Sequence, residues 1–191
     1  MSHMPILFRS QGIIAAGGAA ALALGLSLAL AGCGRSTPPP EGPTPASLAK
    51  ADPLIEALQP APMGVRVIAR FPTPDVAGDS VRAASRVARQ IARAVQAGVK
   101  DLPPGAMTIT LDLYGVDVDK FGKRTPGRFF ETDFDVGDLM DLDLKAKGPA
   151  AVLNTATDLH IDHAGIDPIN AWCMRYPHVG GDWCDMAGVN D

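Results

Sequence analysis

The stretch DSVRAASRVARQIARAVQAGV, residues 79–99, decides the fold of this chain. Its apolar residues recur with a helical period, and no proline or glycine interrupts it before Gly98. At 100° per residue, one side of the helix collects Ala84, Val87, Ala88, Ile91, Ala94 and Val95. A narrow stripe directly opposite collects Arg82, Arg86, Arg89 and Arg93. The sequence therefore predicts one long amphipathic helix, with Asp79 expected as its N-cap.

Alternating segments flank this helix and predict strands. Residues 64–71, GVRVIARF, form the first, and FPTPDVAG behind it is expected to be a turn. Residues 107–116, MTITLDLYGV, and residues 128–136, RFFETDFDV, alternate more regularly. The connection DVDKFGKRTPG joins them, so an antiparallel hairpin with a long loop is expected.

Short helices are expected after the hairpin. One begins near Pro149 and one near Pro168, where Asp167 is placed to cap and proline suits the first turn. A strand, a long helix, a hairpin and short C-terminal helices together predict an α+β fold, a small two-layer sandwich.

The N-terminal residues have the pattern of a secretory signal. Arg9 is the only charge before an apolar run from Gly12 to Gly32, which ends in Leu30-Ala31-Gly32-Cys33. This boundary resembles the lipobox of bacterial lipoproteins. The resemblance implies that residues 1–32 are a signal peptide and that Cys33 carries the lipid. The alternative is an uncleaved anchor, since 21 residues suffice to span a bilayer.

Both alternatives expect the remainder to lie outside the inner membrane, in the periplasm. Gly34 stands where the lipoprotein family places Asp in members kept in the inner membrane, so the resemblance favours the outer membrane. Residues 33–47 then form a proline-rich tether that reaches about 30 Å at the polyproline rise per residue. Residues 48–191 are expected to form a single domain.

The cysteine count fits this compartment. With Cys33 used by the lipid, Cys173 and Cys184 remain, and two thiols in an oxidising compartment predict one disulfide. The chain-entropy model gives such a loop about 3 kcal/mol of stabilisation. Each cysteine follows a tryptophan, which indicates a disulfide shielded by aromatic packing.

Charge divides the chain into two unequal halves. Residues 33–100 carry nine basic and five acidic residues (+4), and residues 101–191 carry seven basic and sixteen acidic residues (−9). The four helix arginines have no acidic neighbour inside the helix, and a guanidinium group suits carboxylate or phosphate partners. Those partners are the acidic half of the chain, anionic lipid headgroups or an acidic protein. The alternative is a solvated helix face. No nucleic-acid partner is expected.

The segment TDLHIDHAG, residues 157–165, resembles the His-x-His-x-Asp-His box of the metallo-β-lactamase superfamily. His160, Asp162 and His163 match that box, whereas Asp158 stands at its first histidine. The family's box lies early in a long domain, and only 28 residues follow His163 here. The context therefore argues against a member of that superfamily.

A simpler metal site needs less of the chain. His160, Asp162, His163 and His178, with Asp182 and Asp185, all lie near the C-terminus, where two or three side chains can converge on zinc. The alternative is a set of polar residues in surface loops. A bound zinc would indicate a small metal-dependent hydrolase, so the metal content of the purified chain separates the two readings.

Other chemistries find little support. Residues 117–128 resemble a calcium loop only in part, because Arg128 stands where a glutamate is required. No GxSxG, SxxK or phosphate-binding loop occurs. Glu131, Asp133 and Asp135 alternate as a glycosidase pair would need, but they are more simply a solvated face that protects a sheet edge. The leading hypothesis is a non-enzymatic envelope lipoprotein that binds or scaffolds a partner, without a cofactor.

Overall fold

The computed structural model describes residues 42–75, 78–146 and 148–189, which belong to one compact unit spanning Glu41–Asp191. The predicted signal peptide, Cys33 and the first part of the tether lie outside the described residues. Among the residues that the structure describes, no helix combines the length and the apolar character needed to cross a membrane.

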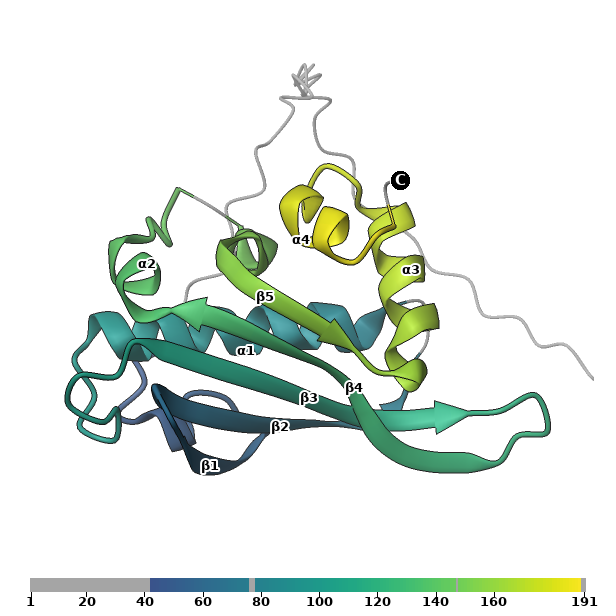
Figure 1. Ribbon diagram of the computed structural model, residues 1–191, viewed down its shortest axis with the longest axis horizontal. Coiled ribbons are helices and arrows are strands. Elements are labelled where there is room, and N and C mark those ends of the chain that lie inside the picture. Colours follow the sequence, from purple (N-terminus) through teal and green to yellow (C-terminus); the bar gives the residue numbers. More distant parts are fainter. Residues whose placement is uncertain (1–41, 76–77, 147, 190–191) are drawn as a thin grey trace, which may run out of the picture. The chain divides into compact units, whose positions relative to one another are not determined.

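A mixed five-stranded sheet forms the centre of this unit (Figure 1). Its order follows the chain: β1 (Ile55–Ala61), β2 (Gly64–Pro74), β3 (Thr108–Val118), β4 (Arg124–Asp135) and β5 (Ala156–Ile161). Strands β2 and β3 are parallel, and every other neighbouring pair is antiparallel. A parallel pair needs a crossover connection, and here the long helix supplies it.

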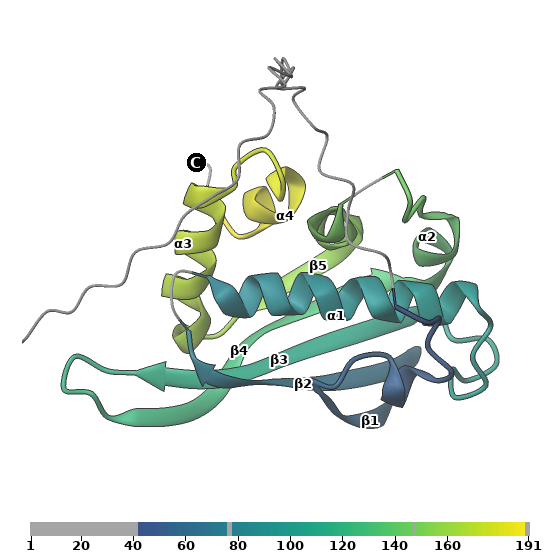
Figure 2. The same cartoon turned by 180° about the vertical axis from the view of Figure 1, so that it is seen from behind.

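That helix, α1 (Asp79–Gln96), runs along one face of the sheet. It lies behind β2, β3 and β4 in Figure 1 and in front of them in Figure 2. The shorter helices are α2 (Val136–Asp141), α3 (Ile166–Arg175) and α4 (Gly181–Met186), with 3-10 turns η1 (Leu48–Lys50), η2 (Pro149–Thr155) and η3 (His163–Gly165). The predicted α+β fold, with one long helix and short C-terminal helices, is confirmed.

The core lies between the sheet and the helices. Alternate residues of the central strands point toward α1 and are fully buried, among them Val67, Leu111 and Phe130. Farther along, Trp183 of α4 meets Phe130 edge to face, with ring centroids 5.4 Å apart. Residues of period two on the strands and period 3.6 on the helix thus meet in one apolar layer, as the sequence pattern predicted.

Two strands were not predicted, and one turn was wrong. β1 contains Pro60, and β5, ATDLHI, places the polar Thr157 and Asp158 side by side, so neither has the apolar alternation that marks a strand. The expected turn after residue 71 does not begin there, because β2 continues to Pro74. Backbone hydrogen bonds to neighbouring strands stabilise these segments, although their sequence patterns do not predict strands.

The two predicted helix caps also differ. The N-cap of α1 is Gly78, and Asp79 is already the first helical residue. The carboxylate that accepts from the first turn belongs to Asp75, whose Oδ1 lies 2.8 Å from the Asp79 nitrogen. In α3 the N-cap is Gly165 rather than Asp167, and no side chain caps that helix.

Candidate functional site

The face of the sheet turned away from α1 is polar. On β2, β3 and β4, the residues between the core positions project to this uncovered face. Register places Ile68, Asp112, Glu131 and His160 in one row across four strands. Figures 1 and 2 show the helices grouped on the other side of the central strands. Charged side chains therefore share a surface that no described helix covers.

Two arginines and three carboxylates form a network on this face. Arg66 Nη1 of β2 donates to Asp112 Oδ2 at 2.7 Å and to Glu131 Oε2 at 2.8 Å. Arg128 of β4 donates through Nη1 to the same Glu131 oxygen and through Nε to Asp162 Oδ2, both at 2.5 Å. The network thus joins β2, β3, β4 and the residue that follows β5.

Asp112 is the buried member of the network. Its side chain is only 3% exposed, and its Oδ1 accepts no hydrogen bond, with Arg128 Nη1 3.6 Å away. Burial raises the pKa of Asp112 above its ordinary value, although the hydrogen bond from Arg66 opposes this. The hydrogen bond from Arg66 lowers the pKa of Glu131. Two carboxyl groups directly opposite each other on neighbouring strands are thus shifted in opposite directions.

Further polar contacts extend the face to β1. Thr110 Oγ1 donates to Asp133 Oδ1 at 2.6 Å. Arg70 Nε pairs with Glu56 Oε1 of β1 at 2.8 Å, and its guanidinium lies 5.3 Å from the centre of the Tyr114 ring. Hydrogen bonds and ion pairs within the chain therefore define the charge pattern of this face.

The interpretation of the β4 acids as an edge-protecting face is wrong. β4 is an interior strand, because β5 pairs along its outer side. Glu131 belongs to the network of two arginines and three carboxylates, and Asp133 accepts from Thr110 on the same face. Asp135 instead caps α2 and accepts from the nitrogens of Gly137 and Asp138 at 2.7 and 3.2 Å.

The four proposed metal ligands do not form a cluster. His160 lies on β5 with its side chain 66% exposed, and its Nε2 is 3.8 Å from Asp162 Oδ1. Asp162 in turn pairs with Arg128. His163 begins η3, and His178 follows α3. Within the described ranges, no three His, Cys, Asp or Glu side chains are placed to hold one metal ion.

The predicted arginine stripe is occupied from within the chain. Arg86 Nε pairs at 2.8 Å with Asp52, a buried carboxylate in the N-terminal half of the domain. Arg82 Nη2 donates to the Tyr176 hydroxyl at 3.0 Å, and the guanidinium lies over the Tyr176 ring.

The other two arginines of the stripe bond to backbone carbonyl groups. Arg89 donates to the carbonyl of Leu144, and Arg93 donates to that of Gly42 at 2.6 Å. The arginines of the stripe thus contact other parts of the chain, and Asp52, the carboxylate partner of Arg86, lies outside the acidic half.

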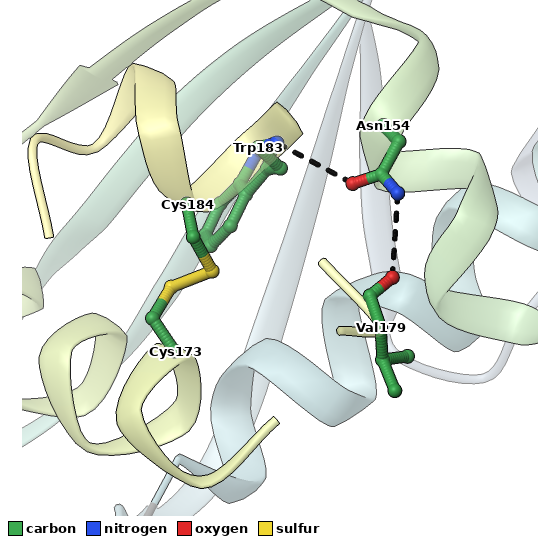
Figure 3. The surroundings of a disulfide bond; sticks show 5 residues. All are labelled: Asn154, Cys173, Val179, Trp183 and Cys184. Atoms are coloured by element: carbon green, nitrogen blue, oxygen red, sulfur yellow. Dashed lines mark hydrogen bonds between the residues drawn. A yellow bond between two sulfur atoms is a disulfide. The ribbon is translucent and has the colours of Figure 1, made fainter. Parts of the chain in front are cut away.

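The two remaining cysteines lie at a buried corner between α3 and α4 (Figure 3). Cys173 and Cys184 are joined with a sulfur–sulfur distance of 2.08 Å. Next to them, the Asn154 side chain of η2 accepts from the backbone nitrogen of Trp183 and donates to the Val179 carbonyl, both at 3.3 Å. The disulfide holds together the two short helices that cover the β4–β5 end of the core.

Sequence reasoning missed the network on the uncovered face, although its signal is in the sequence. In each predicted central strand a charged residue occupies the side opposite the apolar one: Arg66, Asp112 and Glu131. What the sequence does not give is the strand order that brings the three together. Comparison of the chain with models of protein families, with curated proteins and with solved structures finds no match.

Proposed function

We propose that this chain is a lipid-anchored protein of the bacterial envelope whose domain is a non-enzymatic binding module. The observation that carries the proposal is the charged network on the uncovered sheet face, where Arg66, Asp112, Glu131, Arg128 and Asp162 hold one another in place. A fixed pattern of alternating charge on an open surface favours recognition of a complementary surface.

The arrangement suits binding better than catalysis. A catalytic carboxylate must come within hydrogen-bond reach of its substrate. Asp112 is buried, and the Glu131 carboxylate is held by two arginines. Acids outnumber bases on this face. The bases are Arg66, Arg70 and Arg128, and the acids are Glu56, Asp112, Glu131, Asp133, Asp158 and Asp162. The expected partner is therefore a protein that presents basic side chains.

The anchor is supported by the lipobox-like residues before Cys33 and by the proline-rich segment after it. Replacing Cys33 with Ser should leave a full-length precursor that no longer takes up label from a fatty-acid analogue. Labelling that is unchanged by Cys33→Ser would contradict the anchor and leave an uncleaved membrane segment as the explanation.

The binding face is tested by site-specific photo-cross-linking in intact envelopes. A photoreactive residue at His160, whose exposed side chain lies at the rim of the network, should give a discrete adduct with another protein. The matched control is Met140 on α2, which is 58% exposed and lies outside this face. The adduct at His160 should weaken when Asp133 and Asp158, two acids of this face, are both replaced by Asn.

Equal adducts from His160 and Met140, or none from His160, would contradict a specific face. The competing function, a small zinc hydrolase, is tested by metal analysis of the chain purified without a histidine tag. About one tightly held zinc per chain would favour the hydrolase over the binding module.

A further inference from the structure

The hairpin between β3 and β4 extends beyond the rest of the sheet. Pairing of β2 with β3 ends at Val116, and pairing of β4 with β5 ends at Phe130. Beyond these points β3 and β4 pair only with each other, as far as Val118 and Arg124. Figures 1 and 2 show this two-stranded ribbon projecting from one end of the domain.

Hydrogen bonds hold the turn at the tip in a defined shape. The Asp119 carboxylate accepts from the nitrogens of Phe121 and Lys123 at 2.8 and 2.9 Å. Gly122 follows with φ of 79°, a left-handed conformation that suits glycine. As a result the Phe121 side chain points outward and is 82% exposed, the most exposed large apolar side chain among the described residues.

Three cations of the tip lie close to Phe121 in the sequence. Lys120, Lys123 and Arg124 are all exposed, and Lys120 Nζ lies 5.1 Å from the centre of the Phe121 ring. Residues 119–124 carry three basic residues and one acidic residue, a net charge of +2. The half of the chain to which they belong, residues 101–191, carries −9. The tip thus presents basic side chains and one exposed aromatic ring, although it belongs to the acidic half of the chain.

We propose that this tip, residues 118–124, inserts Phe121 into the headgroup region of an anionic phospholipid bilayer. An aromatic ring placed at the headgroup level, with cations beside it that meet lipid phosphates, is the arrangement that interfacial segments use. The half-exposed Val118 adds apolar surface at the base of the tip. Beyond Val116 the extended ribbon continues for about 7 Å to Val118, and the turn of residues 119–123 lies farther out, so the tip can reach the roughly 5–10 Å depth of the interface.

A bilayer fits the tip better than an acidic protein does. The tip is convex and offers a single ring, whereas a stable protein interface usually buries about 800 Å² on each partner. Each cation near an anionic surface adds about fivefold to membrane affinity. The proposed lipid anchor makes this weak attraction sufficient, because it keeps the domain at high local concentration near the bilayer. The inference rests on the proposed function in that respect.

The test uses fluorescence from a tryptophan placed at the tip. The full-length Phe121→Trp variant is reconstituted into phosphatidylcholine vesicles, with or without phosphatidylglycerol, that contain lipids brominated on the acyl chains. Trp172 and Trp183 are buried, and the parent protein gives their constant background. Bromine should quench Trp at position 121 in vesicles that contain phosphatidylglycerol. The control, Met140→Trp on α2, should stay unquenched.

Charge is tested by Lys120→Gln, Lys123→Gln and Arg124→Gln in the Phe121→Trp background. Each substitution should lower the inserted-to-free ratio about fivefold. Quenching at position 121 no greater than at position 140 would overturn the proposal. Equal quenching in vesicles of phosphatidylcholine alone would overturn the role of anionic lipid.

Flotation separates the tip from the anchor. Protein that fails to float with phosphatidylcholine vesicles counts against the proposed lipid anchor, not against the tip. The tip is then judged by whether phosphatidylglycerol vesicles recruit the protein and whether Phe121→Ser abolishes that recruitment. Recruitment that survives Phe121→Ser would overturn the proposal.

Discussion

At the scale of single residues, Asp112 and Glu131 show how one arginine affects two carboxyl groups differently. Both accept from Arg66 Nη1, yet Asp112 is almost fully buried and Glu131 is partly exposed. Desolvation disfavours the ionised form and raises the pKa of Asp112, whereas the hydrogen bond from Arg66 dominates at Glu131 and lowers its pKa. The two groups therefore make opposite contributions to the pH dependence of stability.

These directions give a signed prediction. A raised pKa means that Asp112 contributes stability below the unfolded-state value of about 3.9 and that this contribution is lost as pH rises through the folded-state pKa. A lowered pKa means that Glu131 contributes stability above about 4.3 and that this contribution is lost as pH falls. The free energy of unfolding of the parent, relative to Asp112→Asn, should fall with rising pH.

Relative to Glu131→Gln, the same parent free energy should fall with decreasing pH. Urea unfolding at a series of pH values in the acidic range measures both differences. If the difference in unfolding free energy between the parent and each variant changed with pH in the same direction for both variants, the opposite pKa shifts of the two carboxyl groups would be contradicted.

Arg86 provides a second prediction at this scale. Its partner Asp52 is buried, and Arg86→Ala leaves that carboxylate with the Leu54 nitrogen, at 3.0 Å, as its only donor among the described residues. Because Arg86 itself is half exposed, the expected loss is about 1–2 kcal/mol of unfolding free energy. Arg82→Ala is the control, since Arg82 and Asp79 are both well exposed, and it should cost less than about 1 kcal/mol. Chemical denaturation measures both losses, and equal losses would contradict a structural role for Arg86.

At the scale of elements, the sequence predicted those whose pattern is local. The α1 helix follows from its own periodicity, and β3 and β4 follow from the alternation within residues 107–116 and 128–136. β1 and β5 lie at the two edges of the sheet and alternate poorly, since each has only one neighbouring strand and little buried surface. Their stability comes from pairing with β2 and β4, which no local pattern records.

The cap of α1 gives the prediction at this scale. Asp75 lies four residues before the helix, and its carboxylate accepts from the Asp79 nitrogen, the Ser80 nitrogen and the buried Ser80 hydroxyl. Asp75→Ala should lower the free energy of unfolding by about 1–2 kcal/mol, as the loss of a helix cap does. Asp79→Ala should cost at most about 0.5–1 kcal/mol, because Asp79 acts only through the helix dipole and an exposed ion pair. Thermal unfolding of both variants decides which aspartate caps the helix.

At the scale of the whole molecule, the candidate face could not be predicted, because it depends on strand order. Arg66 and Glu131 are 65 residues apart, and only the parallel crossover through α1 brings β2 beside β3 and thus close to β4. The disulfide pair, in contrast, was predicted from composition and compartment. Cysteines can be counted in the sequence, whereas a network of side chains from several strands depends on how those strands are ordered and aligned.

The disulfide leads to a prediction about how the domain unfolds. Six-residue α4 is too short to be stable alone, so the Cys173–Cys184 bond and the packing of Trp183 on Phe130 hold it. The double variant Cys173→Ala and Cys184→Ala should lose about 3 kcal/mol. In the double variant, amide hydrogen exchange in α3 and α4 should accelerate more than the global loss of stability alone explains. Amides of β3 and β4 should accelerate only by the amount that this global loss explains.

The parent treated with reductant should reproduce this pattern, and the double variant should not respond to reductant. Mass spectrometry of the unreduced parent should find the peptides that contain Trp172 and Trp183 joined. Two alkylated thiols in the native protein would refute the bond. A uniform acceleration of exchange would refute the local role, because it would mean that the sheet depends on the α3–α4 corner as much as the corner depends on its disulfide.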